Sequence, residues 1–275
     1  MIEPDDKDAH VNRAERTQLL AGMIAAAAEA GTKIRQMAAL GVVARSKADA
    51  SPVTDADEAA EAIIERHLHA LLPGVPMIGE EAVASGDRKK PGATFFLVDP
   101  IDGTREFIAK RAEYTVNIGL LIEGTPALGV IYAPALQELY AGGANGAIRL
   151  ALAPGADPAA ASPEPIRIRA AEKNPVATVS HSHLDPATQS WLRTHSVTET
   201  MKLGSSIKFC RVAEGKADVY PRLGPVSEWD IAAGHAILMA AGGSVRAPDG
   251  TPLYYGKIKD DYEVKSFIAA GGMKL

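Results

Sequence analysis

Two aspartates stand at the end of a short, fully apolar segment. Asp99 and Asp102 belong to the sequence Asp-Pro-Ile-Asp-Gly-Thr at residues 99–104, which follows directly on the apolar residues 95–98. Carboxylates at the end of a buried strand are costly unless they are paired or hold a metal. Gly103 permits a close backbone approach, and free amides at a helix start after it would form a phosphate site. The segment therefore predicts a divalent cation that bridges carboxylates to a phosphate.

The same segment also has a simpler interpretation, because Asp-Pro-x-Asp-Gly turns are common on protein surfaces. Three further acidic positions favour the metal site. Glu80 follows a short apolar run and could be a third ligand. Asp230 and Asp57 could each be only a helix-capping acid. Each simpler interpretation holds singly, but four of them in one chain favour a cation site, and oxygen-only ligands favour Mg²⁺ over Zn²⁺.

Histidine and cysteine offer a weaker alternative. Two His-x-His pairs are present, His67 with His69 and His181 with His183. Such a pair shares a face only in a strand, and no third ligand stands at a familiar zinc spacing. Cys210 is the only cysteine, so it can form no intrachain disulfide, and we expect it to pack inside a helix. A reducing compartment is expected from this cysteine usage.

Helices and a largely antiparallel sheet are expected to position the acids of the first half. Apolar residues recur at helical spacing over residues 16–38, which predicts an amphipathic helix. Thr54 is expected to cap a second helix, with Asp57 completing a variant of the capping box. The expected strands are 95–98, 115–123, 127–133 and 139–141, of which the second and third form a hairpin.

The second half alternates strands with helices, which predicts α/β organisation. An Ala/Pro-rich stretch, residues 151–165, is expected to form an exposed loop or link before it. The expected strands are 176–180, 197–202 and 217–220, and the expected helices are 186–195, 206–214 and 231–241. The predicted organisation is an N-terminal arm, 1–15; helices with an antiparallel sheet that carries most metal ligands, 16–150; the loop, 151–165; and a substrate-binding α/β subdomain, 166–275.

Composition bounds the possible partners. The chain has 275 residues, of which 47% are hydrophobic, and 29 Lys and Arg against 34 Asp and Glu give a net charge of −5. This composition excludes a disordered chain, a collagen-like fibre and a disulfide-stapled mini-protein. The mild negative charge argues against nucleic acid or an anionic membrane as partner. The acidic N-terminus is unlike a signal peptide and no segment has the ~20 apolar residues of a membrane span, so we expect a soluble cytoplasmic protein.

The order and spacing of the acidic motifs resemble the inositol monophosphatase superfamily, which comprises Mg²⁺-dependent, lithium-sensitive phosphatases. The motifs are Gly-Glu-Glu at 79–81, Asp-Pro-Ile-Asp-Gly-Thr at 99–104 and Trp-Asp-Ile-Ala-Ala-Gly at 229–234. The resemblance implies a mixed α/β (α+β) fold, a layered α/β/α/β/α sandwich of the sugar-phosphatase type. It also implies an active site between two subdomains, where Asp99, Asp102 and Asp230 converge.

A finer resemblance indicates the CysQ-type 3′(2′),5′-bisphosphate nucleotidases. It rests on the segments 51–54, 105–108, 114–118, 204–210 and 218–222. This branch removes the 3′-phosphate of adenosine 3′,5′-bisphosphate and yields AMP and phosphate in sulfur assimilation. The residue before Glu80 is glycine in this chain, Gly79, whereas serine is common at this position in the branch.

The resemblance implies roles for the matching residues. Two or three Mg²⁺ ions would be held by Glu80, Asp99, the Ile101 carbonyl, Asp102 and Asp230. The catalytic group would be Glu80, Asp57 and Thr104, of which the last two orient and deprotonate the attacking water. The scissile phosphate would be held by the amides of Gly103 and Thr104. The nucleotide would be contacted by Ser205, Lys208 and Arg222, with His183 as a further candidate.

Two other functions stay open. The same chemistry could act on inositol monophosphate or another sugar phosphate, or the chain could be an inactive nucleotide-binding regulator. Positive charge at Lys208 and Arg222 favours a substrate with a second phosphate, because Arg can grip a phosphate with two hydrogen bonds. The complete acidic set argues against an inactive protein. The expected partner is therefore a small molecule, bound by a monomer or homodimer.

Overall fold

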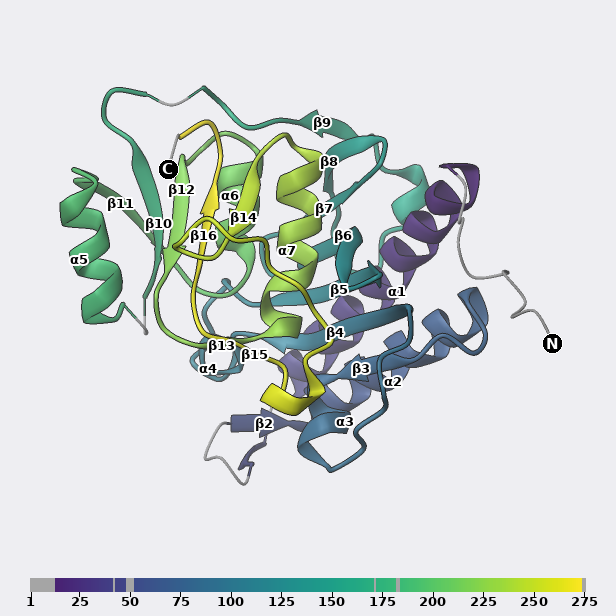
Figure 1. The fold of residues 1–275 in the computed structure, drawn as a ribbon. Coiled ribbons are helices and arrows are strands. Elements are labelled where there is room, and N and C mark those ends of the chain that lie inside the picture. The colour runs from purple at the N-terminus through teal and green to yellow at the C-terminus, as the bar shows by residue number, and fades with distance from the viewer. Residues whose placement is uncertain (1–12, 42, 48–51, 171, 182–183, 274–275) are drawn as a thin grey trace, which may run out of the picture.

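The computed structural model describes residues 13–41, 43–47, 52–170, 172–181 and 184–273 (Figure 1). Two β-sheets form its framework, one of seven strands and one of five. The helices α1 (Arg13–Leu40) and α2 (Asp55–Leu71) cover the outer face of the larger sheet. The helices α6 (Ile207–Ala213) and α7 (Glu228–Ala240) fill the space between the sheets, and α5 (Pro186–Thr194) packs outside the smaller one. This order of layers confirms the expected α/β/α/β/α sandwich.

Both helices of the outer layer are present where the apolar pattern predicts them. Helix α1 extends a few residues beyond the expected range at each end. Helix α2 begins after Thr54, whose side chain accepts from the backbone while Asp57 closes the capping box. The short strands β1 (Ala44–Ser46) and β2 (Pro52–Thr54) pair in front of α2 and were not expected. Within the described part of the chain, no helix is long and apolar enough to cross a membrane.

The larger sheet is antiparallel except where β3 and β4 run parallel. Its strands, in spatial order, are β3 (Met77–Gly79), β4 (Thr94–Asp102), β5 (Thr115–Ile122), β6 (Thr125–Ala133), β7 (Glu138–Gly143), β8 (Gly146–Ala151) and β9 (Glu164–Ile166). The β5–β6 hairpin is confirmed. Strand β8 was missed, because its apolar residues do not alternate regularly. The short helices α3 (Glu80–Ala84) and α4 (Thr104–Ile108) follow β3 and β4.

The Ala/Pro-rich stretch is more structured than a loop. It contains the 3₁₀ helix η1 (Pro158–Ala160), and its last residues begin β9, which pairs with β8 at the edge of the sheet. Leu152 is buried at 2% exposure. Apolar packing at one end and strand pairing at the other therefore hold this stretch against the larger sheet.

The smaller sheet combines parallel and antiparallel strands. Its spatial order is β11 (Glu199–Leu203), β10 (Val176–Ser180), β12 (Val219–Arg222), β16 (Phe267–Ala270) and β14 (Ser244–Arg246). The first three strands are parallel, as strand–helix alternation predicts, whereas β16 and β14 add antiparallel pairs that were not expected. The remaining elements are β13 (Val226–Ser227), the 3₁₀ helix η2 (Ile258–Asp260) and β15 (Glu263–Val264).

Three glycines in register let α7 lie close against the larger sheet. Gly119, Gly129 and Gly142 occupy neighbouring strands and pair directly with one another across the sheet. A β-carbon on Gly119 would lie 3.1 Å from the β-carbon of Ala232, and one on Gly142 would lie 2.6 Å from the α-carbon of Ile237. Such distances are shorter than ordinary van der Waals contact. The bare glycine backbones therefore set the position of α7, which begins beside the candidate site.

Candidate active site

A pocket of about 210 Å³ opens at the end of β4, between the two sheets. Its wall contains both acidic and basic side chains from six elements of the fold. Among its lining residues are Glu80, Asp102, Gly103, Thr104, Ser205, Lys208, Arg222 and Asp230. The structure therefore brings together most of the residues that the sequence singled out, from positions up to 150 apart along the chain.

The end of β4 is irregular, and this irregularity presents its two aspartates. Asp99 pairs with Asn117 and Asp102 with Thr115, with a shift of register between them. Such irregularities commonly re-aim side chains beside active sites. Asp99 is 1% exposed, whereas Asp102 is only half-buried. Gly103 follows at φ = +92°, where a β-carbon would lie 3.1 Å from the Glu113 carbonyl oxygen, and α4 begins at the next residue.

The acidic side chains raise one another's pKa. Burial, and then the neighbouring carboxylates of Glu80 and Asp102, raise the pKa of Asp99 well above its ordinary value. Burial and the same two carboxylates raise the pKa of Asp230. Burial also raises the pKa of Asp57, although hydrogen bonds from Thr54 oppose it. Adding positive charge to this cluster would therefore favour the ionised carboxylates.

Lys47 supplies one such positive charge. Its Nζ lies 2.7 Å from Glu80 Oε1 and 2.8 Å from Glu81 Oε1, and its side chain is only 9% exposed. Burial lowers the pKa of Lys47, but the two carboxylates more than offset this effect, so the pKa is raised overall. Burial raises the pKa of Glu81 to about 7 despite this contact. Lys47 was not anticipated, since a lone lysine outside any motif gives no signal in the sequence.

The donor set suits a hard cation, but it is not preassembled. Across the described residues, no three His, Cys, Asp or Glu side chains are arranged as a ready ligand set. Glu80 is instead held by Lys47. The clustered groups are carboxylates and the buried Ile101 backbone, and oxygen donors of this kind fit Mg²⁺ rather than Zn²⁺.

Within the described part of the chain, His67, His69 and His181 belong to no group of three potential metal ligands. His67 and His69 both lie in α2, where residues two apart do not share a face. His67 Nε2 contacts Glu29 at 2.6 Å on the surface. His181 lies 3.8 Å from Glu113, and His183 lies outside the described residues.

Asp57 serves a cap and faces the site at the same time. Its Oδ2 accepts from the Thr54 amide at 2.8 Å and from the Thr54 hydroxyl at 2.6 Å. Its Oδ1 lies 3.3 Å from Thr104 Oγ1, which also lies 3.0 Å from the Ile101 carbonyl oxygen. Asp230 is similar, because its Oδ2 accepts from the Ser227 amide at 3.1 Å in a second capping box. The capping interpretation and a role in the site are thus compatible.

Gly79 leaves room for the side chain of Glu61, which supports the start of α3. The Glu61 carboxylate accepts from the amides of Glu81 and Ala82 at 2.9 and 2.8 Å, at the start of this helix. A β-carbon on Gly79 would overlap the Glu61 carboxylate. The glycine therefore allows a buried acid to fix the helix start that carries Glu80.

Ser205 and Lys208 also line the pocket. Ser205 adopts φ = +43°, an uncommon conformation for a residue other than glycine. Its hydroxyl is buried and has no hydrogen-bond partner among the described residues. The Lys208 ammonium donates to the Ser205 carbonyl and lies 5.2 Å from the centre of the Tyr220 ring. Burial lowers the pKa of Lys208 to about 8, and Arg222 stands at the end of the adjacent strand β12.

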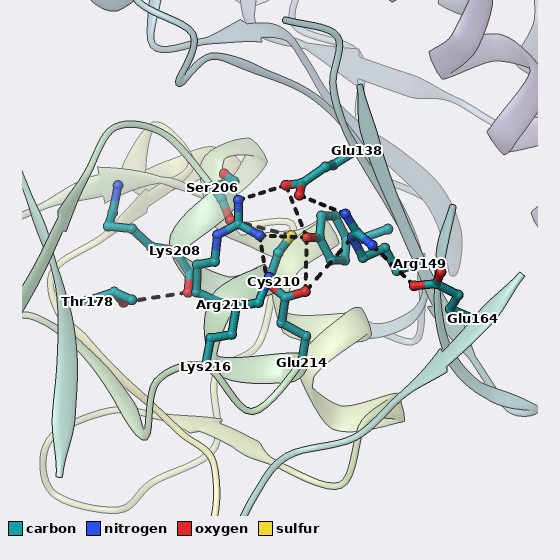
Figure 2. Close-up of polar contacts among 11 residues, drawn as sticks. Glu138, Arg149, Glu164, Thr178, Ser206, Lys208, Cys210, Arg211, Glu214 and Lys216 are labelled. Atoms are coloured by element: carbon teal, nitrogen blue, oxygen red, sulfur yellow. Dashed lines mark hydrogen bonds and ion pairs between the residues drawn. The ribbon is translucent and has the colours of Figure 1, made fainter. Parts of the chain in front are cut away.

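An ion-pair cluster anchors α6 on the side opposite Lys208 (Figure 2). Arg211 contacts Glu138 of β7 at 2.7 Å and Glu214 at 2.6 Å. Arg149 of β8 contacts the other oxygen of Glu138 at 2.9 Å, and the Tyr140 hydroxyl accepts from Arg211 at 2.7 Å. This cluster ties the helix that carries Lys208 to the larger sheet.

The sequence of this chain is similar to those of known proteins. The sequence model described as the inositol monophosphatase family matches residues 15–273. The 3′(2′),5′-bisphosphate nucleotidase CysQ of Escherichia coli strain K12 is 41% identical over 210 residues, which cover 76% of this chain and 82% of that protein. The protein of the same name from Aggregatibacter actinomycetemcomitans is 32% identical, and the match covers 88% of each chain.

Solved structures agree with these relatives. The crystal structure of CysQ from Bacteroides thetaiotaomicron, a bacterial member of the inositol monophosphatase family, superposes with a TM-score of 0.79 and 37% identity. The match covers 96% of this chain and 100% of that one. An inositol monophosphatase from Anabaena has a TM-score of 0.71 and 27% identity, and covers 94% of this chain and 92% of its own. The chain therefore belongs to the inositol monophosphatase family and, within it, to the CysQ-type branch.

Proposed function

We propose that this protein is a Mg²⁺-dependent 3′(2′),5′-bisphosphate nucleotidase, which hydrolyses adenosine 3′,5′-bisphosphate to AMP and phosphate. One observation carries the proposal: a single pocket is lined both by the carboxylates of Glu80, Asp102 and Asp230 and by the positive charges of Lys208 and Arg222. The carboxylates suit a cation and the scissile phosphate. Lys208 and Arg222 suit a second phosphate, which a monophosphate ester lacks.

Different residues of the site activate the water, hold the phosphate and hold the cations. Asp57 and Thr104 orient the attacking water, whose proton passes toward Asp57 Oδ1 as the water oxygen bonds to phosphorus. The bond from phosphorus to the 3′-oxygen breaks, and this oxygen takes a proton from solvent to become the 3′-hydroxyl of AMP. The amides of Gly103 and Thr104, at the start of α4, hold the phosphate oxygens. Two or three Mg²⁺ ions, when bound, would make water a stronger nucleophile and stabilise the leaving oxygen. The residues proposed to hold them are Glu80, Asp99, Ile101 through its carbonyl, Asp102 and Asp230.

The Lys47 contact supports the cation site. An ammonium between Glu80 and Glu81 offsets their charge, so a divalent cation at Glu80 would replace one positive charge with a stronger one. Nucleotide binding is supported by the Ser205 hydroxyl, which has no hydrogen-bond partner in the described part of the chain and can donate to a phosphate or ribose oxygen. Lithium sensitivity, a role in sulfur assimilation, a cytoplasmic location and a monomeric or homodimeric state complete the proposal.

The test is phosphate release from adenosine 3′,5′-bisphosphate and inositol 1-phosphate, measured side by side with Mg²⁺, with EDTA and with Li⁺. We expect a strong preference for the nucleotide, which EDTA abolishes and Li⁺ reduces. Preference for the inositol ester would keep the metal site but overturn the substrate. Release from neither compound, with the nucleotide still bound, would instead support an inactive regulator.

A further inference from the structure

Four elements of the fold meet at the hydroxyl of one buried serine. Ser206, at the start of α6, is 2% exposed. Its Oγ lies 2.5 Å from Asp102 Oδ2 at the end of β4, and 2.6 Å from the Asp230 carbonyl oxygen in α7. It also accepts from Asn117 Nδ2 of β5 at 2.8 Å.

A serine hydroxyl carries one proton, and the surroundings decide where it goes. Asn117 is a donor here, since its Nδ2 faces both Ser206 Oγ and, at 3.4 Å, Asp102 Oδ2. Ser206 therefore accepts from Asn117 and donates its proton toward the two oxygens of Asp102 and Asp230. The Ser206 hydroxyl and the Asn117 amide thus both contact Oδ2 of Asp102 and bridge it to α6 and β5. Together they fix the rotation of this carboxylate.

We propose that Ser206 and Asn117 are positioning residues for the cation site: they orient the Asp102 carboxylate and hold the α7 segment that carries Asp230. The inference rests on the proposed function, because it assigns a supporting role around its Mg²⁺ ligands. Residues that orient metal ligands in this way typically contribute ~10- to 100-fold to metal affinity. The bridge also couples the cation site to α6, whose first turn carries Lys208.

A purely structural role is the competing explanation, and two features of Asn117 argue against it. Its side chain is fully buried, yet its Oδ1 has no hydrogen-bond partner among the described residues. An unsatisfied buried polar atom destabilises the folded state, so an apolar residue would serve packing better. Its amide donors instead point at Ser206 and Asp102.

The test titrates Mg²⁺ alone into the protein by isothermal titration calorimetry, with no nucleotide present. Ser206→Ala should raise the dissociation constant for Mg²⁺ by ~10-fold or more. Asn117→Ala should also raise this dissociation constant. The loss in the double variant should be smaller than the product of the two single losses, because both side chains contact the same oxygen of Asp102. In phosphate-release assays, added Mg²⁺ should restore most of the turnover of Ser206→Ala.

Tyr132→Phe is the matched control. It also removes one buried hydroxyl, which donates to the Leu152 carbonyl at 3.0 Å on the outer side of the larger sheet. It should lower the melting temperature without changing Mg²⁺ affinity. If Ser206→Ala behaves like Tyr132→Phe, with a lower melting temperature and Mg²⁺ affinity within about twofold of wild type, the inference is wrong while the proposed function stands. A wild-type protein that binds no Mg²⁺ would overturn both.

Discussion

Asp57 Oδ1 lies 3.3 Å from Thr104 Oγ1, across the gap between α2 and α4. The contact joins residues 47 positions apart, and each has a second partner that holds it in place. Thr54 holds the other oxygen of Asp57, and the Ile101 carbonyl lies 3.0 Å from the threonine hydroxyl. The pair is thus preorganised beside the start of α4, where the phosphate is proposed to bind.

Removing the threonine hydroxyl tests this pair. Thr104→Ala should lower kcat by ~10²-fold or more, in the range usual for a proton-transfer group, and leave KM for the nucleotide nearly unchanged. Thr104→Ser, which keeps the hydroxyl, should retain most of the activity. Steady-state kinetics with adenosine 3′,5′-bisphosphate checks both variants. Similar losses in the two variants would contradict a role for the hydroxyl.

Asp102→Asn tests the metal ligands directly. It keeps the size of the side chain but removes the charge at the end of β4. Turnover should fall ~10³-fold, because metal-ion catalysis contributes several kcal/mol to the lowering of the barrier. Asp157→Asn, the same change at the exposed N-cap of η1, is the control and should leave phosphate release unchanged. Undiminished turnover in Asp102→Asn would refute the metal site.

The proposed role of Lys208 and Arg222 is tested by removing both positive charges. In the double variant Lys208→Ala with Arg222→Ala, kcat/KM for adenosine 3′,5′-bisphosphate should fall ~10²-fold or more, since each charge-assisted hydrogen bond contributes about 1.5–3 kcal/mol. Hydrolysis of a simple phosphate monoester should be largely spared. Equal losses on the two substrates would count against the assignment of Lys208 and Arg222 to the second phosphate.

Lys208 also predicts a pH dependence. Burial lowers its pKa to about 8, Asp102, Glu106 and Asp230 oppose this effect, and Arg222 adds to it. The charged form that attracts phosphate therefore predominates below pH 8 and is lost above it, so kcat/KM for the nucleotide should decline as pH rises past about 8. The free energy of unfolding changes in the opposite direction. Because the pKa of Lys208 is lower in the folded state than in the unfolded chain, the folded state becomes more stable as pH rises from 8 toward 10.5.

The control for this profile is Lys208→Arg, since an arginine stays charged throughout the range. Its kcat/KM should show no decline near pH 8. A decline that persists in Lys208→Arg would assign the titration to another group.

The cluster behind α6 predicts a large loss of stability. Arg211 and Glu138 are 12% and 14% exposed, so Arg211→Leu leaves nearby carboxylates with too little positive charge. Breaking a buried pair in this way costs ~3–5 kcal/mol of unfolding free energy. Arg66→Ala removes a comparable pair that is 64% and 46% exposed, and it should cost less than ~1 kcal/mol. Urea unfolding of both variants measures the contrast, and equal losses would contradict it.

Local features of the fold were predictable from the sequence because they depend on neighbouring residues. The Thr54 cap of α2, the apolar strand before Asp99 and the β5–β6 hairpin follow from short-range patterns, and the structure has all three. The acidic motifs likewise identified the family. The strands β8 and β9 were not predictable, because pairing with a neighbouring strand stabilises sequences with a weak pattern of their own.

The site itself was decided by tertiary packing. The sequence named Asp57, Glu80, Asp102 and Asp230, but their approach depends on how α2, α3, β4 and α7 are placed. The register of Gly119, Gly129 and Gly142 sets α7 against the sheet, and the contact of Ser206 with Asp102 joins residues 104 positions apart. A sequence motif fixes which groups can do chemistry, whereas the distances between them arise only when separate elements pack against a common sheet.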